Sequence, residues 1–400
     1  MLRIPPDEAR GTTPVVSSRS GLTDGRREKG EAMTTDLEHR GSTAEPSPDP
    51  AAVEAFAERV FGYYTGGMVT YMIDVGHRTG LLDRLAEAPA SSDELAARGG
   101  ASERYVREWL AALTAAGVVS YDPRTVRYEL PTEHAVCLTG GGALNLAPQS
   151  QITSLLATYV PDVARAFTEG GGVPFEAYRP AFTNVMDGLS RGVLDSTLME
   201  GILPCASPLP ERMLHGIRVA DVGCGTGHST NLMARHYPAS RFVGYDIATH
   251  ALDRAREEAA GWALGNVSFD ARDARELPVD PPFDAVFAFD VIHDLVDPAG
   301  VLRRIHDALA PGGVFVMYDV DAASSLEDNL DHPLAPFIYS VSTLHCLTVS
   351  LSEDGAGLGT AWGRDRATGL LGDAGFAEIG VHDLPDDPLN CLYVASKATR

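Results

Sequence analysis

The sequence lacks several features that would assign it to a familiar class of protein. It has no run of about 18 consecutive apolar residues, so we expect no transmembrane helix. Its first residues contain no apolar core followed by a small-residue cleavage site, and we therefore expect no secretory signal. The five cysteines are scattered, and none forms a Cys-x-x-Cys pair. This spacing argues against a disulfide framework and a zinc site, and it favours a reducing cytoplasm.

Positive charge is also scarce. The chain has 32 Lys and Arg residues against 55 Asp and Glu residues, which gives a formal net charge of −23. A field of this sign repels phosphate backbones and anionic membranes at long range. We therefore expect a small-molecule partner, with no nucleic acid and no membrane as the target.

Composition and periodicity divide the chain into four predicted segments. Residues 1–50 are rich in Ser, Thr, Pro and Gly without apolar periodicity, which predicts a disordered tail. Residues 51–140 have the order helix, turn, helix, hairpin, which is typical of a winged helix. Residues 141–215 are predicted to be a helical linker. In residues 216–400 apolar strands alternate with amphipathic helices, which predicts an α/β domain with a mostly parallel sheet.

Local signals refine two of these segments. Ser91 or Ser92 is expected to cap a short helix that has Glu94 in its first turn. At the end of the chain, the predicted strands 378–384 and 390–397 are close together in sequence. One of these two strands is therefore expected to run antiparallel to the rest of the sheet.

The strongest chemical signal is the glycine-rich stretch VADVGCGTGHST at residues 219–230, which ends the first strand of the α/β segment and opens a helix. Glycines allow a tight turn that brings backbone N–H groups against a ligand. The spacing of Gly223, Gly225 and Gly227 differs from the Gly-x-Gly-x-x-Gly pattern of dinucleotide sites. Asp221 lies two residues before the first glycine, where its charge suits a ligand that is cationic and carries no phosphate.

Acids at the next two strand ends extend this site. Asp246 ends the strand RFVGYD, where a carboxylate accepts hydrogen bonds from both hydroxyls of a ribose. Asp273 follows the next strand and is placed to accept from the exocyclic amine of an adenine, with Ile247 and Ala274 beside the ring. The alternative is that Asp246 and Asp273 only cap helices.

The motif VADVGCGTG, the acid Asp246, the segment DARD and the stretch FDAVFAFDVIHDLVDP together resemble the class I S-adenosylmethionine-dependent methyltransferases. Residues 52–398 resemble a bacterial subfamily, frequent in actinobacteria, that has an N-terminal winged helix. ERYVREWLAAL, GGGVPFEAY, SLEDNL and STLHCLTVSL carry this likeness.

The resemblance implies a Rossmann-like α/β fold with a seven-stranded, mostly parallel sheet and S-adenosyl-L-methionine as cofactor. It also implies a winged helix that serves dimerisation and substrate enclosure, and hence a homodimer. The expected cofactor-binding residues are Asp221, Gly223, Cys224, Gly225, Gly227, Asp246, Ile247, Asp273, Ala274 and Asp290.

His293 and Asp294 are the expected catalytic residues. Methyl transfer requires an aligned nucleophile and, for a hydroxyl, removal of its proton. His293 follows a strand end and is similar to the His of the His-Asp-Trp segment of small-molecule O-methyltransferases, where it is the general base; here Leu295 replaces the Trp. A structural histidine is the alternative. Asp290 is a candidate partner for the methionine amino group or a substrate amine, and without a second His at ligand spacing no metal is expected.

Five further residues have open interpretations. Glu327, Asp328 and Asn329 follow the next strand and either orient a base, bind polar groups of the substrate, or form a solvated loop. His345 and Cys346 lie in an apolar stretch and are expected to line a pocket or belong to the core rather than to act in catalysis.

Two other classes of function compete with methyl transfer. A winged helix can belong to a transcription regulator that senses S-adenosylmethionine or another small ligand. Against this, acids balance the arginines of residues 77–130, so no phosphate-binding surface stands out. A nucleotide-dependent oxidoreductase is opposed by the glycine spacing. The sequence therefore predicts methyl transfer to an O, N or C atom of a small molecule, in keeping with secondary metabolism.

Overall fold

The computed structural model describes residues 47–142, 144–384 and 387–399. Most of the tail that was predicted to be disordered, residues 1–46, lies outside the described residues. The described chain divides into two units between Tyr64 and Thr65, and helix α1 (Pro50–Thr79) has residues in both. The boundaries expected at residues 140 and 215 stay predictions.

The winged-helix region is built from short elements. Ser91 and Glu94 form a reciprocal capping box at the start of the third helix, as the sequence predicted. Leu82, Leu95 and Leu110 are fully buried between the helices. The elements after α1 are α2 (Leu81–Glu87), α3 (Ser92–Gly99), α4 (Glu103–Ala115), β1 (Ser120–Asp122), β2 (Arg127–Glu129) and α5 (Thr132–Leu138), with β1 antiparallel to β2.

A run of helices connects this region to the large sheet. It contains α6 (Gln149–Ala157), α7 (Val160–Glu169), α8 (Phe175–Tyr178), α9 (Ala181–Thr197), a π-helical turn (Leu198–Ile202), α10 (Leu203–Cys205) and α11 (Leu209–His215). The segment 170–173 passes close to the backbone of a later helix. A Cβ added at Gly172 would lie 1.8 Å from the Thr348 carbonyl oxygen, so the close approach requires glycine at this position.

The large sheet has seven strands in the order β5-β4-β3-β6-β7-β9-β8. Among the described strands of this sheet, β9 alone runs opposite to the other six, which confirms the expected mixed sheet. The strands are β3 (Arg218–Val222), β4 (Arg241–Asp246), β5 (Val267–Ala271), β6 (Phe283–Phe289), β7 (Leu309–Val320), β8 (Ala377–Asp383) and β9 (Asn390–Ser396). Strand β3 has four consecutive buried residues, as expected for a strand covered on both faces.

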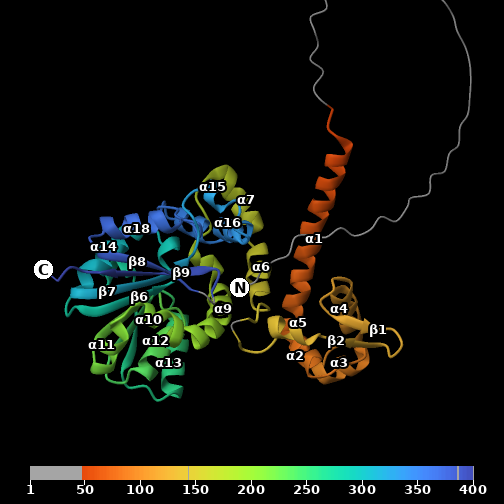
Figure 1. The fold of residues 1–400 in the computed structure, drawn as a ribbon, viewed down its shortest axis with the longest axis horizontal. Coiled ribbons are helices and arrows are strands. Elements are labelled where there is room, and N and C mark those ends of the chain that lie inside the picture. Colours follow the sequence, from red (N-terminus) through yellow and green to blue (C-terminus); the bar gives the residue numbers. More distant parts are fainter. Residues whose placement is uncertain (1–46, 143, 385–386, 400) are drawn as a thin grey trace, which may run out of the picture. The chain divides into compact units, whose positions relative to one another are not determined.

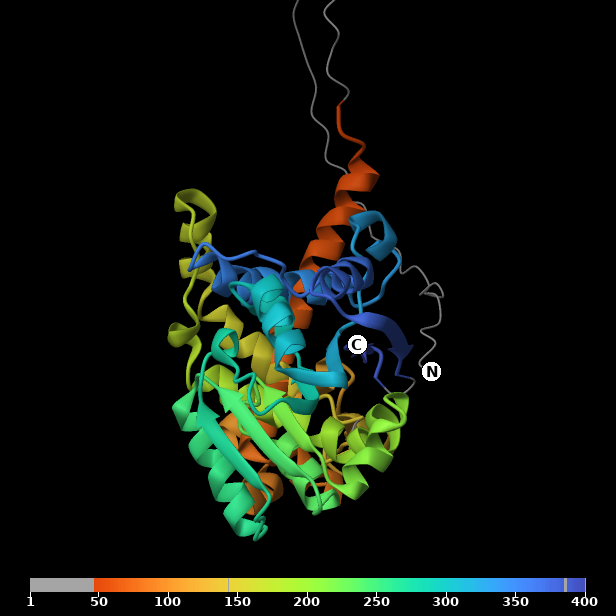
Figure 2. The same ribbon diagram turned by 90° about the vertical axis from the view of Figure 1, so that its left-hand side faces the viewer.

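Helices cover both faces of this sheet (Figures 1 and 2). On one face α14 and α18 pack on β3, β6, β7 and β9, and on the other α11 and α12 pack on β3, β4 and β6. The helices of this region are α12 (His228–His236), α13 (Thr249–Gly261), α14 (Pro298–Ala308), α15 (Leu326–Asn329), α16 (Ala335–Leu344), α17 (Cys346–Leu351) and α18 (Arg364–Asp373). This alternation confirms the predicted Rossmann-like α/β class.

Among the described residues, no helix combines the length and the apolar character that crossing a membrane requires. All five cysteines are free thiols.

Candidate active site

The candidate site residues gather because parallel strands end at one edge of the sheet. The glycine loop follows β3, Asp246 ends β4, and Asp290 follows β6. Strand β7, which is parallel to β6 in register, brings Asp319 to the same edge. Ligands of open α/β sheets bind at this carboxyl edge, next to the point where the strand order reverses.

The glycine loop is shaped by its contacts with β4. The amide of Gly225 donates to Asp246 Oδ2 at 2.8 Å, and the amide of Ala248 donates to Asp246 Oδ1 at 2.7 Å. Gly223 has a φ of 69°, and a Cβ there would lie 2.4 Å from Val291 Cγ2. Gly225 has a φ of 53°, and a Cβ there would meet no atom within 4 Å. The loop therefore closes against the protein at Gly223 and faces open space at Gly225.

The two carboxylate oxygens of Asp221 differ in their hydrogen bonding. Its Oδ2 accepts from the hydroxyls of Ser229 at 2.7 Å and Thr230 at 2.6 Å. Its Oδ1 is buried and has no hydrogen-bond partner among the described residues. Burial raises the pKa of Asp221 to about 6, although the two hydroxyls act in the opposite direction. A buried oxygen of this kind suits a cationic amine donor.

Asp246 and Asp273 already have protein partners. Burial raises the pKa of Asp246 against the effect of the two amides that it binds. Asp273 caps the short turn 274–276 by accepting from the Arg275 amide at 2.8 Å, and it forms an ion pair with the Arg275 guanidinium. The expected capping role of Asp273 is therefore present. Its contact with an adenine stays a prediction, as do those of Ile247, which is 49% exposed, and Ala274.

His293 forms a buried pair with an acid that the sequence interpretation did not single out. Its Nδ1 lies 2.7 Å from Oδ1 of Asp319, and the two residues are 4% and 0% exposed. The same oxygen accepts from the Val320 amide at 2.8 Å and from the indole N–H of Trp362 at 3.2 Å. Asp319 is thus fixed from three sides, and it in turn fixes the orientation of the imidazole.

The charges around His293 are unusual for a buried site. Burial lowers the pKa of His293, but the Asp319 carboxylate outweighs this effect, and the net pKa is well above its usual value. Burial raises the pKa of Asp294 to about 6, against the opposite effect of the His293 imidazole. The carboxylate that holds His293 is therefore Asp319, while a catalytic role for Asp294 stays a prediction.

Asp290 completes a cluster of titratable side chains. It has a φ of 53°, rare for a residue with a side chain, and such strain is concentrated at functional sites. Its Oδ1 is buried without a partner in the described part of the chain, and burial raises its pKa well above the usual value. One ligand atom each of Asp290, His293 and Asp319 lies within 4.8 Å of the others. These residues are close enough to surround a single cationic group.

The loop after β7 is held by hydrogen bonds between its own residues. The Asn329 amide donates to the carbonyl oxygens of Ala323 at 2.8 Å and Ser325 at 2.9 Å, and Asp328 accepts from the Ser325 hydroxyl. Asn329 is buried and holds the loop, a structural role that the sequence interpretation did not include. No contact of Glu327 with the His293 pair is present in the described residues.

An aromatic cluster lies next to the His293 pair. His345 is fully buried and stacks on Phe182, with ring centroids 3.6 Å apart, while Phe175 and Tyr178 meet its edges. Neither of its ring nitrogens has a hydrogen-bond partner among the described residues, and burial lowers its pKa to about 3. The neighbouring Cys346 contributes to the pKa of His293, so the two groups are close. His345 and Cys346 thus belong to the core beside the site.

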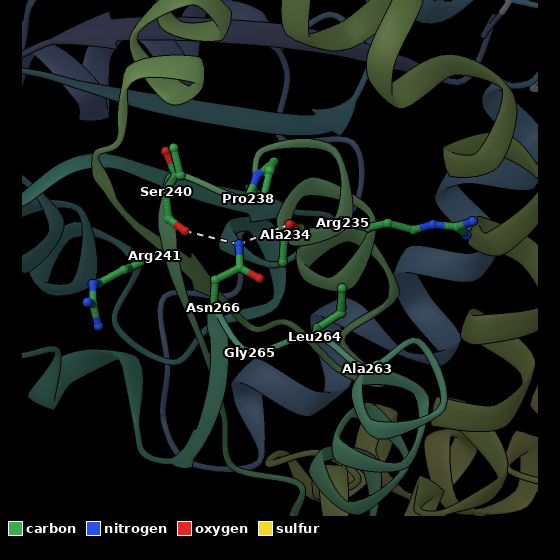
Figure 3. Close-up of a pocket in the computed structure, with 10 residues that line it drawn as sticks. Ala234, Arg235, Pro238, Ser240, Arg241, Ala263, Leu264, Gly265 and Asn266 are labelled. Atoms are coloured by element: carbon green, nitrogen blue, oxygen red, sulfur yellow. Dashed lines mark hydrogen bonds between the residues drawn. The ribbon is translucent and has the colours of Figure 1, made fainter.

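A surface pocket at the opposite edge of the sheet does not have the character of an active site. Figure 3 shows it around Asn266, whose side-chain amide donates to the carbonyl oxygens of Ala234, Tyr237 and Ser240. The side chains of Arg235 and Arg241 point away from each other. No charged groups converge here, and Asn266 has a structural role in joining the segments.

The fold and the carboxyl-edge site define a winged helix followed by a domain of the class I methyltransferase type. Residues 214–349 match a family model described as "Methyltransferase domain", and residues 67–140 match the "Rv2258c-like winged HTH domain". The chain thus contains both domains that the sequence predicted.

Known proteins resemble the chain in part or in fold. It is 36% identical over 116 residues to the trans-aconitate 2-methyltransferase of Methylobacterium nodulans, which covers 29% of this chain and 40% of that protein. The chain spans less than half the length of such curated relatives. The structure of human N-acetylserotonin methyltransferase has a TM-score of 0.65 at 20% identity, covering 89% of this chain and 100% of that one. The structure of the mitomycin 7-O-methyltransferase has a TM-score of 0.64 at 19% identity, and the match covers 87% of this chain and 100% of that one. At identities of 19% and 20%, these two structures show that the chain shares their fold.

Proposed function

We propose that the protein is an S-adenosylmethionine-dependent methyltransferase that methylates an oxygen atom of a small molecule. The observation that carries this proposal is the buried pair of His293 and Asp319, placed at the same edge as an anionic, glycine-lined loop. A histidine that is fixed through Nδ1 is suited to remove a proton from a hydroxyl. The hydroxyl acceptor is therefore favoured over the N and C acceptors that the sequence left open.

The described residues fit the proposed cofactor. When bound, the cofactor supplies a methyl group activated by the positive sulfonium. The open side of Gly225 gives room for the nucleoside, and Asp246 and Asp273 are the acids for the ribose and the adenine. The unpartnered oxygens of Asp221 and Asp290 suit the methionine amino group. Because the site offers buried acid oxygens that have no partner among the described residues, it favours this ligand over a pyrophosphate.

The chain's own residues prepare the acceptor. With Nδ1–H donated to Asp319, the neutral imidazole presents Nε2 as the nitrogen that accepts the proton of the acceptor hydroxyl. Asp319 also stabilises the imidazolium that forms. Burial of both groups excludes water, which strengthens their interaction.

The class of acceptor follows from charge and surroundings. The relatives are named for trans-aconitate, mitomycin and N-acetylserotonin. A buried site with several carboxylates disfavours a polycarboxylate such as trans-aconitate, because like charges repel at low dielectric. The aromatic cluster around His345 favours a planar, apolar body. We therefore propose a neutral phenolic or enolic compound of secondary metabolism as the acceptor.

Assembly and location belong to the same proposal. Helix α1 exposes a set of large apolar side chains, each more than half exposed: Val53, Phe56, Phe61, Tyr63, Tyr64 and Met68. Exposed apolar surface of this extent is typical of an interface. We propose that α1 forms a homodimer contact, and that the protein works in the cytoplasm, where its free cysteines stay reduced.

The competing regulator finds little support. Arginines of the winged-helix region are paired with acids, as in Arg107 with Glu103 and Arg127 with Glu94, both at 2.6 Å. Paired arginines leave little net charge for a phosphate backbone. A titration with duplex DNA at low salt is expected to show no binding; tight, salt-sensitive binding would restore the regulator.

The decisive assay offers radiolabelled S-adenosylmethionine and a panel of phenols, carboxylic acids and amines to the purified protein. We expect label on a phenol. With that acceptor, His293→Ala is expected to lower kcat by about 10² to 10⁴, the usual contribution of a general base, with unchanged affinity for S-adenosylhomocysteine. A variant with full kcat would remove His293 as the base, and an active panel restricted to amines would contradict O-methylation.

A further inference from the structure

The glycine loop is tied to a helix that lies outside the cofactor fold. The hydroxyl of Thr226, between the last two motif glycines, donates to Asp187 Oδ1 at 2.6 Å. Asp187 belongs to α9, 39 residues earlier in the chain. The Asp187 side chain is 9% exposed and Thr226 is 7% exposed, so this contact is largely shielded from water. A hydrogen bond from a hydroxyl to a shielded carboxylate is stronger than one between neutral groups.

Two arginines hold the Asp187 carboxylate in position. Arg191 contacts its Oδ1 at 2.8 Å, and Arg254 of α13 contacts its Oδ2 at 2.6 Å. Burial raises the pKa of Asp187, but Thr226 and the arginines outweigh this effect, and the net pKa is below its usual value. Asp187 is therefore a fixed, charged acceptor for the loop hydroxyl.

A second contact joins the same loop to the same helix. His228 Nε2 lies 2.9 Å from Asp195 of α9, and its Nδ1 lies 3.0 Å from Glu258 of α13. Glu258 also accepts from Arg191 at 2.5 Å. The loop segment 226–228 is thus held by acids of α9 and α13.

The other side of α9 belongs to the aromatic cluster. Phe182, near its start, stacks on His345, and Val185 is buried in the same cluster with Tyr178. Helix α9 (labelled in Figure 1) therefore contacts both the candidate cofactor loop and the proposed wall of the acceptor site. A change in the loop can be transmitted to that wall through a single rigid element.

We propose that Asp187 is a positioning residue that fixes the cofactor loop through Thr226 and thereby couples cofactor binding to the order of α9. The inference rests on the proposed function, because it takes the glycine loop as the cofactor site. Asp187 does not touch the open side of Gly225; it holds the neighbouring backbone in the conformation that faces the ligand. A ligand that presses on this loop therefore stabilises α9, and by linkage an ordered α9 favours the ligand.

The test combines affinity with hydrogen exchange on the full chain, with S-adenosylhomocysteine as the probe. Thr226→Val and Asp187→Asn are each expected to weaken binding about ten-fold, and the double variant by clearly less than the product of the two losses, because the two changes share the Thr226–Asp187 hydrogen bond. Thr226→Ser keeps the hydroxyl and is expected to retain the wild-type affinity. Asp253→Asn is the control, since the Asp253 side chain is 71% exposed and, in the described part of the chain, pairs with Arg256 alone.

Hydrogen exchange separates coupling from simple stability. In the wild type and in Asp253→Asn, the probe is expected to slow amide exchange in residues 181–197. In Thr226→Val and Asp187→Asn that protection is expected to be lost even at saturating probe. The inference would be overturned by wild-type affinity in both variants, by fully additive losses in the double variant, or by failure of Thr226→Ser to bind. It would also be overturned if the probe left the amide exchange of α9 unchanged in the wild type. A wild type that binds no S-adenosylhomocysteine would instead overturn the proposed function.

Discussion

At the scale of single residues, the proposed chemistry depends on how charge is distributed among buried acids. Asp319 is fully buried and holds His293 through Oδ1, while Asp319 Oδ2, Asp221 Oδ1 and Asp290 Oδ1 are buried without a partner among the described residues. A buried acid without a partner is costly, because the interior solvates its charge poorly. A cationic ligand relieves that cost, and this links binding of the cofactor to the protonation of the site.

The pair of His293 and Asp319 predicts a pH profile. The imidazolium cannot accept a proton, so kcat rises with pH through the pKa of His293, which Asp319 raises above its usual value. In Asp319→Asn the imidazolium of His293 loses the stabilising carboxylate, so the rise in kcat is expected at lower pH. The maximum kcat is also expected to be lower, because the tautomer of His293 is no longer fixed. The measurement is kcat against pH for both proteins. A rise at the same pH in both would show that Asp319 does not control the base.

Asp221 predicts a second dependence on pH, this time in binding. Its pKa of about 6 means that its carboxylate is charged at pH 7.5 and largely protonated at pH 5. A protonated Asp221 attracts the amino group of the ligand less, so affinity for S-adenosylhomocysteine is expected to fall as the pH drops through 6. Calorimetry across this range tests it, with Asp221→Asn as the comparison that binds weakly and with a flatter pH dependence. Equal affinity at both ends in the wild type would exclude this role.

At the scale of elements, the carboxyl ends of the parallel strands do the positioning. The loop after β3 is shaped by Asp246 at the end of β4, which binds two backbone amides. One residue thus holds the loop and, in the proposal, binds the ribose.

Replacing Asp246 is therefore expected to affect the loop and the ligand together. Asp246→Ala should weaken binding of S-adenosylhomocysteine by at least about 100-fold, since hydrogen bonds to a charged group contribute about 1.5 to 3 kcal/mol each. The control is Asp284→Ala, which removes an acid of the same sheet that contacts Arg212 at the opposite strand end. Near-normal affinity in Asp246→Ala would remove this residue from the site.

The sequence was a good guide to these elements and a partial guide to the site. Strands such as RFVGYD were predictable because uninterrupted apolar residues are bounded by turn signals, and Asp246 and the glycine loop lie at their ends. Asp319 was missed because its partner His293 lies 26 residues away on another element, and spacing along the chain does not report such pairs. The acid in VMYDV at the end of β7 was the available signal. The ties of Thr226 to Asp187 likewise depend on helix packing that periodicity does not encode.

At the scale of the whole molecule, the chain has a formal net charge of −23, and the candidate site is also rich in acids. This field attracts a cationic cofactor and disfavours polyanionic acceptors and nucleic acids. The winged helix, with its paired arginines, therefore serves a role other than DNA binding in this account.

The exposed apolar side chains of α1 predict the state of assembly. Replacing Phe56 and Phe61 together by Ser is expected to convert a dimer into a monomer, since both side chains are more than 60% exposed in the single chain. Light scattering after size exclusion gives the mass, and the exposed pair Glu54→Gln and Glu58→Gln on the same helix serves as the control. A wild type that is already monomeric would contradict the dimer.

The proposal as a whole depends on a glycine loop that holds a nucleoside with an ammonium group and no phosphate. The decisive measurement is calorimetric titration of the purified protein with S-adenosylhomocysteine and, separately, with NAD. We expect saturable one-to-one binding of S-adenosylhomocysteine and no heat from NAD. Binding of NAD with a silent S-adenosylhomocysteine titration would contradict the account.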